Sequence, residues 1–181
     1  MKITETTSVT YKVRGGPCAG WADITLREWP EGGSFMCQSD FGEFSHIWGS
    51  IGKRSFTEFL CGLDKDYFLK KTCPKDYLVH AHQETCKAIK KDIIQIRKEL
   101  YITPENARTC WDECTELESE LCVGVEAFFH YFSATNAFEI LYHGDYSAVP
   151  TRQRYNPRCD AFWEKVWPHI TEYWMEKEGL S

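Results

Sequence analysis

The residues best suited to bind another molecule form a basic and aromatic cluster near the C-terminus, at Arg152, Arg154, Tyr155 and Arg158. Side chains of these types can hold phosphates and stack on a nucleobase. They are also the residue types that contribute most binding energy in protein interfaces. The same residues would suit a solvated loop that lies beside acidic helices. The pattern therefore predicts either such a loop or a binding surface for protein or nucleic acid.

A second charged region is acidic. Six acids and no base occur between residues 112 and 126: Asp112, Glu113, Glu116, Glu118, Glu120 and Glu126. The segment before it is basic, with Lys87, Lys90, Lys91, Arg97 and Lys98. Antiparallel packing of two helices would place these opposite charges side by side. Alternatively, Glu116 and Glu120 belong to a partly exposed strip that imitates the charge of a nucleic-acid backbone, and so bind a partner.

Cysteine and histidine residues offer a possible metal site. The nine cysteines are Cys18, Cys37, Cys61, Cys73, Cys86, Cys110, Cys114, Cys122 and Cys159. Cys110 and Cys114 stand one helical turn apart and could ligate zinc with His80, His82 and Cys86. However, the three cysteines of this set fall on hydrophobic stripes, and the chain has no Cys-x-x-Cys pair. We expect buried thiols and no bound metal.

Two glycine-rich segments resemble reactive loops. Cys18, in residues 15–21, could be a nucleophile, but it needs a nearby histidine or helix N-terminus to lower its pKa, and a strand follows it. Residues 49–55 carry Lys53 and Arg54 before a helix and could hold an anion. They depart from a phosphate-binding loop because position 47 is Ile and Arg54 separates Lys53 from Ser55. We expect simple connecting loops in both places.

No signature of catalysis is present in the sequence. Gly-x-Ser-x-Gly, His-Glu-x-x-His and Gly-x-Gly-x-x-Gly are all absent. These motifs build a nucleophile elbow, a zinc site and a dinucleotide site, respectively. We therefore predict no catalytic residue and no cofactor. An active site assembled from residues far apart in the sequence is still an alternative.

The elements that must carry these residues follow from hydrophobic periodicity. Alternation with a period of two predicts strands near residues 9–13, 22–26, 34–39 and 44–48. A turn signal at residues 30–33 joins two of them. The simplest arrangement is an antiparallel meander of about four strands. The sheet face bearing Phe44, His46 and Trp48 is either covered by helix or left open for binding.

The pattern changes to a helical period at Ser55, which forms a capping box with Glu58. Helices are expected at residues 56–63, 86–100 and 104–121, with Thr103 as a cap before Pro104. The two longer ones share a hydrophobic seam and should pack antiparallel. A buried helix is expected over residues 123–142, a loop over 145–158, and a last helix that Pro168 interrupts. The fold class is therefore α+β in a single domain, with residues 1–54 forming the sheet part and 55–181 the helical part.

Composition limits the setting in which the protein works. The chain has 181 residues, 43% of them hydrophobic, and a formal net charge of −6, which argues against a dedicated duplex-DNA binder. No apolar run approaches the length of a membrane span. The N-terminal segment lacks the apolar core of a signal peptide. We expect a protein of the cytoplasm that does not contact the membrane.

Several runs of the sequence resemble an accessory-protein family of tailed bacteriophages and prophages. The runs are 24–26, 33–42, 44–49 and 59–68, followed by 144–146, 149–150 and 155–157 with Trp163 beyond them. In that family, a strand ending in Trp and Gly precedes a helix with an Asp-x-x-Tyr segment. The resemblance implies a nonessential gene product that acts inside the infected bacterium, and it carries over no catalytic residue. This chain departs from the family in its many cysteines and in the basic character of its arginine loop.

The main hypothesis is an interaction protein that binds a host protein or complex and modulates or inhibits it. A bacterial antiviral system such as CRISPR–Cas would be one target. One alternative is a phage nucleic-acid-binding accessory protein that uses the arginine loop, and another is a small enzyme that acts on nucleotides or proteins.

Overall fold

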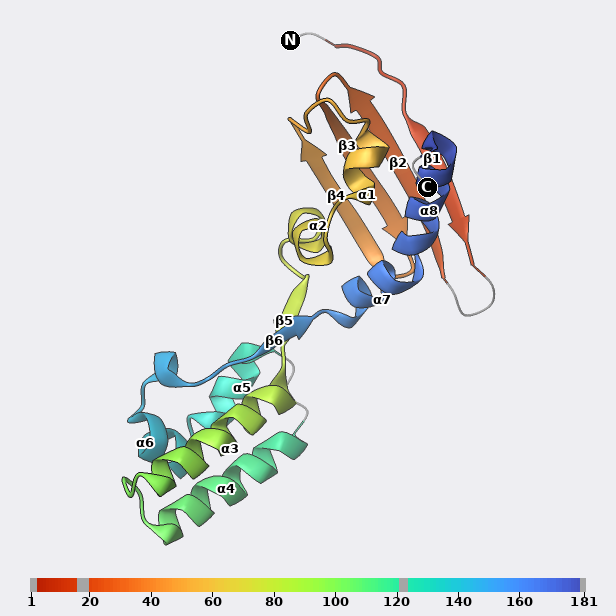
Figure 1. Cartoon of the computed structure of the whole chain (residues 1–181). Coiled ribbons are helices and arrows are strands. Elements are labelled where there is room, and N and C mark those ends of the chain that lie inside the picture. Colours follow the sequence, from red (N-terminus) through yellow and green to blue (C-terminus); the bar gives the residue numbers. More distant parts are fainter. Residues whose placement is uncertain (1–2, 16–19, 121–123, 180–181) are drawn as a thin grey trace. The chain divides into compact units, whose positions relative to one another are not determined.

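The chain folds into two compact units, each with its own hydrophobic core (Figure 1). This computed structural model describes residues 3–15, 20–120 and 124–179. Unit 1 comprises Met1–Tyr77 and Tyr155–Ser181, and unit 2 comprises Leu78–Arg154. Unit 2 is thus an insertion in the chain of unit 1.

Unit 1 is built on a four-stranded antiparallel sheet, which confirms the meander predicted from the sequence. The strands are β1 (Val9–Arg14), β2 (Trp21–Trp29), β3 (Gly32–Ser39) and β4 (Gly42–Trp48), in the order β1-β2-β3-β4. Ile24 pairs with Cys37, and Cys37 pairs with Phe44. Because side chains alternate along a strand, these three residues share one buried face.

The hairpin between β2 and β3 turns at Pro30 and Glu31, where Glu31 adopts a positive φ of 65°. The two glycines expected in this turn instead begin β3. A Cβ atom on Gly33 would lie 2.5 Å from the ring of Phe56. Glycine is therefore needed here because the first helix packs directly against the backbone of the strand.

Four helices cover one face of this sheet: α1 (Phe56–Cys61), α2 (Lys65–Thr72), α7 (Pro157–Lys165) and α8 (Trp167–Glu178). The covered face is the one that bears Phe44, His46 and Trp48. Ring contacts join the layers, with 4.2 Å between the centroids of Phe44 and Phe162. The opposite face carries exposed residues such as Met36 and Ile47.

The cap predicted at Ser55 is present, and α2 begins with a cap at Asp64 that was not predicted. The Ser55 hydroxyl accepts a hydrogen bond from the Glu58 amide, and the Asp64 side chain accepts one from the Tyr67 amide. The expected interruption near Pro168 is present, since α7 ends at Lys165 and α8 begins at Trp167. Pro168 occupies the first turn of α8, where a missing amide is tolerated.

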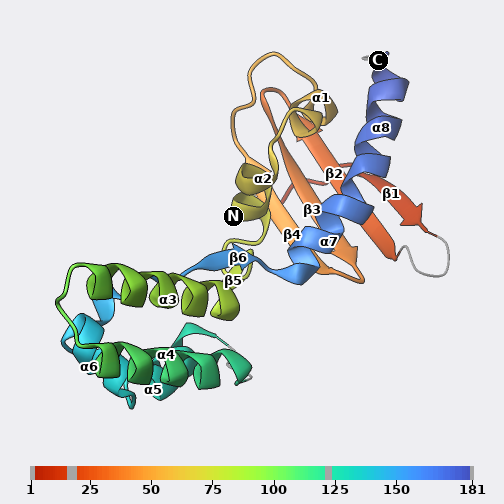
Figure 2. The same cartoon turned by 60° about the horizontal axis from the view of Figure 1, so that its bottom comes forward.

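Unit 2 is centred on a helical hairpin, α3 (His82–Lys98) and α4 (Pro104–Ser119), whose two helices lie side by side (Figure 2). The seam predicted from the sequence is buried on both helices. On α3 it contains Cys86, Ile89 and Ile93, and on α4 it contains Cys110, Cys114 and Leu117. The Thr103 side chain caps α4 by accepting a hydrogen bond from the Asn106 amide.

The prediction of one continuous helix over residues 123–142 is wrong. The structure has two shorter helices, α5 (Val125–Phe132) and α6 (Asn136–Tyr142). The hydroxyl of Thr135 accepts a hydrogen bond from the Phe138 amide and donates one to the Phe132 carbonyl. Thr135 thus caps the start of α6 and bonds the last turn of α5. These local hydrogen bonds compete with those of a continuous helix and break it here, although the apolar residues continue on both sides.

The loop expected over residues 145–158 also contains regular structure. Tyr146–Ala148 form a short 3-10 helix. Strand β6 (Gln153–Tyr155) pairs with β5 (Leu78–His80) in a two-stranded sheet, at the points where the chain enters and leaves unit 2. This pairing joins segments far apart in the sequence, so no local pattern could indicate it. None of the helices in the described ranges combines the length and apolar character needed to cross a bilayer.

Candidate functional site

The C-terminal part of the predicted basic cluster is fixed at the start of α7. Asn156 caps this helix, since its side-chain oxygen accepts a hydrogen bond from the Arg158 amide at 3.0 Å. Its own amide donates to the Tyr77 carbonyl at 2.8 Å. Pro157 follows the cap in the first helical position. The backbone that carries Arg158 is therefore held in one conformation.

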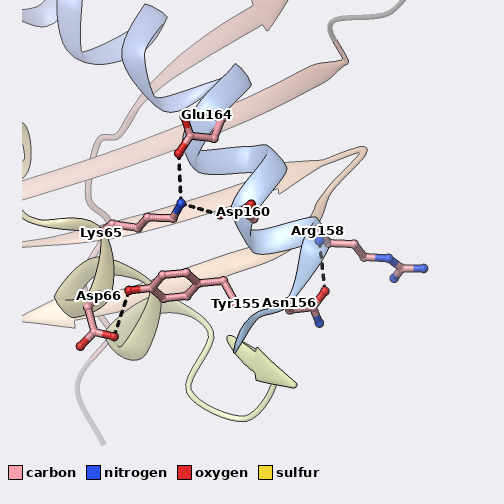
Figure 3. Close-up of polar contacts among 7 residues, drawn as sticks. All are labelled: Lys65, Asp66, Tyr155, Asn156, Arg158, Asp160 and Glu164. Atoms are coloured by element: carbon pink, nitrogen blue, oxygen red, sulfur yellow. Dashed lines mark hydrogen bonds and ion pairs between the residues drawn. The ribbon is translucent and has the colours of Figure 1, made fainter. Parts of the chain in front are cut away.

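Tyr155 packs against α2 inside unit 1, as Figure 3 shows. Its ring lies 4.9 Å from the Lys65 ammonium, and its hydroxyl donates a long hydrogen bond of 3.4 Å to Asp66. Burial and the Asp66 carboxylate raise the pKa of Tyr155 above its ordinary value. The side chain is half-buried and contributes mainly to the packing of unit 1.

Lys65 is the centre of a charged network that the sequence did not reveal. Its ammonium lies 2.5 Å from Asp160 and 3.0 Å from Glu164, which are one turn apart on α7. Burial opposes the charge of Lys65, but the bonds and charges of the two carboxylates outweigh it and raise its pKa. The spacing of Asp160 and Glu164 was the only available signal, because Lys65 lies far away in the chain. The network ties α2 to α7.

Arg158 extends away from this network into solvent (Figure 3). Within the described part of the chain, its guanidinium has no hydrogen bond or ion pair. Its charge is therefore available to another molecule, whereas its amide is used by the Asn156 cap.

Arg152 and Arg154 belong to unit 2, so the structure divides the predicted cluster between the two units. The Arg152 amide donates to the Thr85 hydroxyl at 2.9 Å, and its carbonyl accepts from the Ala81 amide at 2.8 Å. Arg154 lies on β6. Both side chains are exposed, and neither guanidinium has a partner among residues 3–15, 20–120 and 124–179.

The acidic strip on α4 is only partly neutralised within unit 2. Glu118 forms the expected pair with the basic helix, at 2.6 Å from Lys90. Glu113 instead accepts hydrogen bonds from the amides of Asn136 and Ala137 at the start of α6. Glu116 and Glu120 are exposed, and neither carboxylate contacts a base in the described ranges. These two acids can still meet a partner.

The cysteine and histidine residues considered as metal ligands lie in or beside the core of unit 2. Cys86, Cys110 and Cys114 are buried, as expected from their stripes. The His82 ring nitrogen Nε2 is already 2.7 Å from the Leu117 carbonyl. Among the residues that the structure describes, no three His, Cys, Asp or Glu side chains form a cluster suited to a metal.

Burial also makes several of the described thiols poor nucleophiles. It raises the pKa of Cys114 to about 12, with nearby Cys86 and Cys110 adding to the effect. It raises the pKa of Cys37 and Cys159 to about 12 as well. A thiol with so high a pKa is protonated at neutral pH and reacts slowly. Cys18, the candidate considered above, lies outside the described residues.

Residues at the start of α1 donate hydrogen bonds to carboxylates of the protein itself. The Phe56 amide donates to Glu28 at 2.9 Å, and the Ser55 hydroxyl donates to Glu178 at 2.5 Å. Thr57 also donates to Glu178. These carboxylates occupy the Ser55 hydroxyl and two donors of the first turn of α1, where an anion at the helix start would otherwise bind.

The chain matches a known protein family. A family model described as a phage family matches residues 1–176 of the 181-residue chain. No curated protein matches the chain. No solved structure matches it either. The match covers the sheet, the inserted helical unit and nearly all of α8, which agrees with the resemblance seen in the sequence. The chain therefore belongs to this family of phage proteins.

Proposed function

We propose that this phage protein acts by binding a protein complex of the infected bacterium and modulating or inhibiting it. The observation that carries the proposal is the state of Arg152, Arg154 and Arg158. Each side chain is exposed and has no partner in the described structure, while the backbone beneath Arg152 and Arg158 is fixed by hydrogen bonds. Arginines of this kind suit an interface rather than the fold.

The physical reason is the entropy cost of binding. Ordering a flexible loop weakens association, so a backbone that is already fixed leaves only the side chain to be ordered. The guanidinium group presents several donors in one plane and can bind a carboxylate through two parallel bonds. Each of these arginines therefore favours a partner surface that carries carboxylates or other anions.

The acidic residues Glu116 and Glu120 support the same function in a different way. Their exposed carboxylates can meet a surface that normally binds nucleic acid, because such surfaces are rich in lysine and arginine. A bacterial complex that binds nucleic acid, such as an antiviral system, has such a surface. Occupying it would inhibit the complex without any chemical step.

Affinity purification of the tagged protein from the bacterial host tests the proposal. A stoichiometric host protein should remain bound, and mass spectrometry would identify it. Charge reversal by Arg152→Glu with Arg154→Glu, or by Glu116→Lys with Glu120→Lys, should weaken this binding about tenfold or more. Arg158→Glu is made separately, because Arg158 belongs to unit 1.

Matched controls use exposed lysines that have no part in the proposed contacts. Lys70→Glu in unit 1 and Lys87→Glu in unit 2 should leave binding unchanged. If every charge-reversal variant binds like the controls, the assignment of these residues is wrong. Recovery of nucleic acid alone, with affinity that falls steeply as salt rises, would instead identify a nucleic-acid-binding protein. Recovery of neither would reject the binding proposal.

A further inference from the structure

The α3–α4 hairpin of unit 2 has a second surface that the proposed function does not use. An open groove of about 460 Å³ lies between the two helices, and the seam residue Ile93 forms part of its lining. Its floor is formed by Ile93, Ile94, Ala107 and Trp111. Ile94 is 45% exposed and Trp111 is 37% exposed, so a substantial apolar area faces solvent. Exposed apolar surface of this kind is typical of an interaction site.

Three cations border this floor and no acid lines it. They are Arg97, Lys98 and Arg108. In the described part of the chain, none of the three forms an ion pair. Glu105 and Asp112 stand three residues before and four residues after Arg108 on α4, but they do not line the groove. The groove therefore combines an apolar floor with an unneutralised basic rim, and its charge complements an acidic occupant.

The tip of the hairpin adds an unusual feature at the end of the groove. Leu100 follows α3 with a positive φ of 63°. The Tyr101 amide donates to the Ile96 carbonyl and the Leu100 amide donates to the Arg97 carbonyl, which is the hydrogen-bond pattern of a Schellman cap. Glycine is strongly preferred at this position because a Cβ atom disfavours the left-handed conformation.

Leu100 also has little to do with the core. Its side chain and that of Tyr101 are each 78% exposed. The chain thus keeps a large apolar residue where it strains the backbone and buries little surface. Such an outlier points to a role outside the fold. The tip connects Lys98 to Pro104, both of which line the groove, so the tip lies next to one end of the groove.

We propose that this surface, formed by the groove and the tip, binds an acidic amphipathic helix of a partner protein. Helix backbone groups are already paired within α3 and α4, so an extended peptide would find few backbone partners here. A helix satisfies its own backbone and needs only apolar anchors for the floor and acids for the rim. Residues 93–98 and 104–111 span about two helical turns, which accommodates anchors at positions i, i+4 and i+7.

Nucleic acid suits the same surface less well. The floor is mainly aliphatic, whereas single strands bind through aromatic platforms. One face of Trp111 is occupied by the Lys90 ammonium, 5.3 Å from the ring centroid, and Glu118 holds that ammonium in place. Acidic residues also outnumber basic ones over residues 78–154. The local basic rim is therefore better matched to a short acidic segment than to a long polyanion.

Fluorescence anisotropy with the full-length protein tests this with three labelled probes. The first is a designed helix of about four turns with leucine anchors flanked by glutamates. The second replaces every glutamate with lysine, and the third is a single-stranded DNA of mixed sequence. The glutamate helix should bind with a Kd of about 100 µM or tighter, at least about tenfold tighter than the lysine helix.

Charge reversal supplies the sharper test. Arg97→Glu with Arg108→Glu should invert the preference, so that the variant binds the lysine helix more tightly than the glutamate helix. Lys87→Glu with Lys91→Glu changes the same number of charges on exposed positions of α3 outside the groove, and should keep the original preference.

Leu100→Gly separates a binding role from a folding role. Glycine relieves the left-handed backbone, so thermal unfolding should shift upward by about 2–6 °C, while the glutamate helix should bind about fivefold or more weakly. A purely structural role for Leu100 cannot explain a variant that is more stable but binds the glutamate helix less tightly.

The proposal is overturned if the glutamate helix does not bind, if the two helices bind equally, or if the DNA binds best. It goes beyond the proposed function and involves none of the same residues. If the groove does not bind the glutamate helix, the proposed function can still be correct, because it depends on Arg152, Arg154, Arg158, Glu116 and Glu120. If the variants of those residues bind normally, the groove proposal can likewise still be correct.

Discussion

His80 and His82 lie against the ring of Phe128, with their ring centroids 4.9 and 5.7 Å from it. The Nε2 atom of His80 is buried and has no hydrogen-bond partner among the described residues. Burial lowers the pKa of His80 below its ordinary value of 6.5, and the neighbouring His82 lowers it further. The folded protein therefore resists protonation of this ring.

This shift predicts a loss of stability in mild acid. Below pH 6.5 His80 binds a proton in the unfolded chain but stays neutral in the folded protein. The free energy of unfolding therefore falls as the pH falls. His80→Phe removes this proton uptake and keeps a ring against Phe128. Thermal unfolding measured between pH 7.5 and 5 should therefore depend less on pH in the variant.

A matched control for this measurement is His169→Gln, which changes an exposed histidine of unit 1. It should keep the pH dependence of the unmodified protein. Equal pH dependence in His80→Phe and the unmodified protein would show that His80 titrates alike in the folded and unfolded states.

Individual residues differ in how far the sequence could predict their roles. The basic character and exposure of Arg152, Arg154 and Arg158 follow from their type. The packing of Tyr155 on Lys65 and Asp66 does not, because those partners lie about ninety residues away in the chain. The function proposed for these residues stays a prediction until binding is measured.

At the scale of elements, Glu113 shows how one helix supports another. Its carboxylate accepts hydrogen bonds from the Asn136 and Ala137 amides, the latter at 2.8 Å, and so caps α6 from α4. An acid at a helix N-terminus is favoured by both hydrogen bonding and the helix dipole. We expect Glu113→Ala to lower the free energy of unfolding by about 1–2 kcal/mol.

Glu113→Gln retains one oxygen acceptor and should cost less. Glu116→Ala removes an exposed carboxylate from the same helix and should change stability by less than about 0.5 kcal/mol. Urea unfolding followed by circular dichroism measures all three. The capping role would be refuted by equal stability of the two alanine variants.

The sequence predicted elements well where a local rule dominated. Ser55 and Thr103 lie at helix starts because each side chain can bond an amide three residues later. The break between α5 and α6 was missed because the apolar residues on both sides suggested one buried helix. Thr135 was the available signal, and it could have been read as a cap.

At the scale of the molecule, unit 2 has a core of its own. Ile89, Phe128 and Phe132 are fully buried in it. We expect residues 78–154, produced alone, to be helical and to unfold cooperatively, because their core does not depend on the sheet. Circular dichroism during thermal unfolding checks this, and a broad transition without cooperativity would count against it.

The complementary variant lacks residues 78–154 and joins Tyr77 to Tyr155 through a short glycine-serine linker. The Asn156 amide donates to the Tyr77 carbonyl at 2.8 Å, so the ends left by removing unit 2 are adjacent. Unit 1 should therefore keep its sheet and four helices. The sequence predicted the sheet and the helices that follow it, but the division into units depends on the long-range pairing of β5 with β6.

The insertion also sets the order in which the core can form during synthesis. The sheet leaves the ribosome early, but α7 and α8, which cover much of its buried face, are made only after all of unit 2. At about 5–20 residues per second, translation of the insertion delays them by on the order of ten seconds. During that interval Phe44 lacks the ring of Phe162 on which it stacks in the folded protein, and Phe35 lacks its contact with Trp167. We expect such a chain to bind ribosome-associated chaperones and to aggregate more readily when many ribosomes translate it at once.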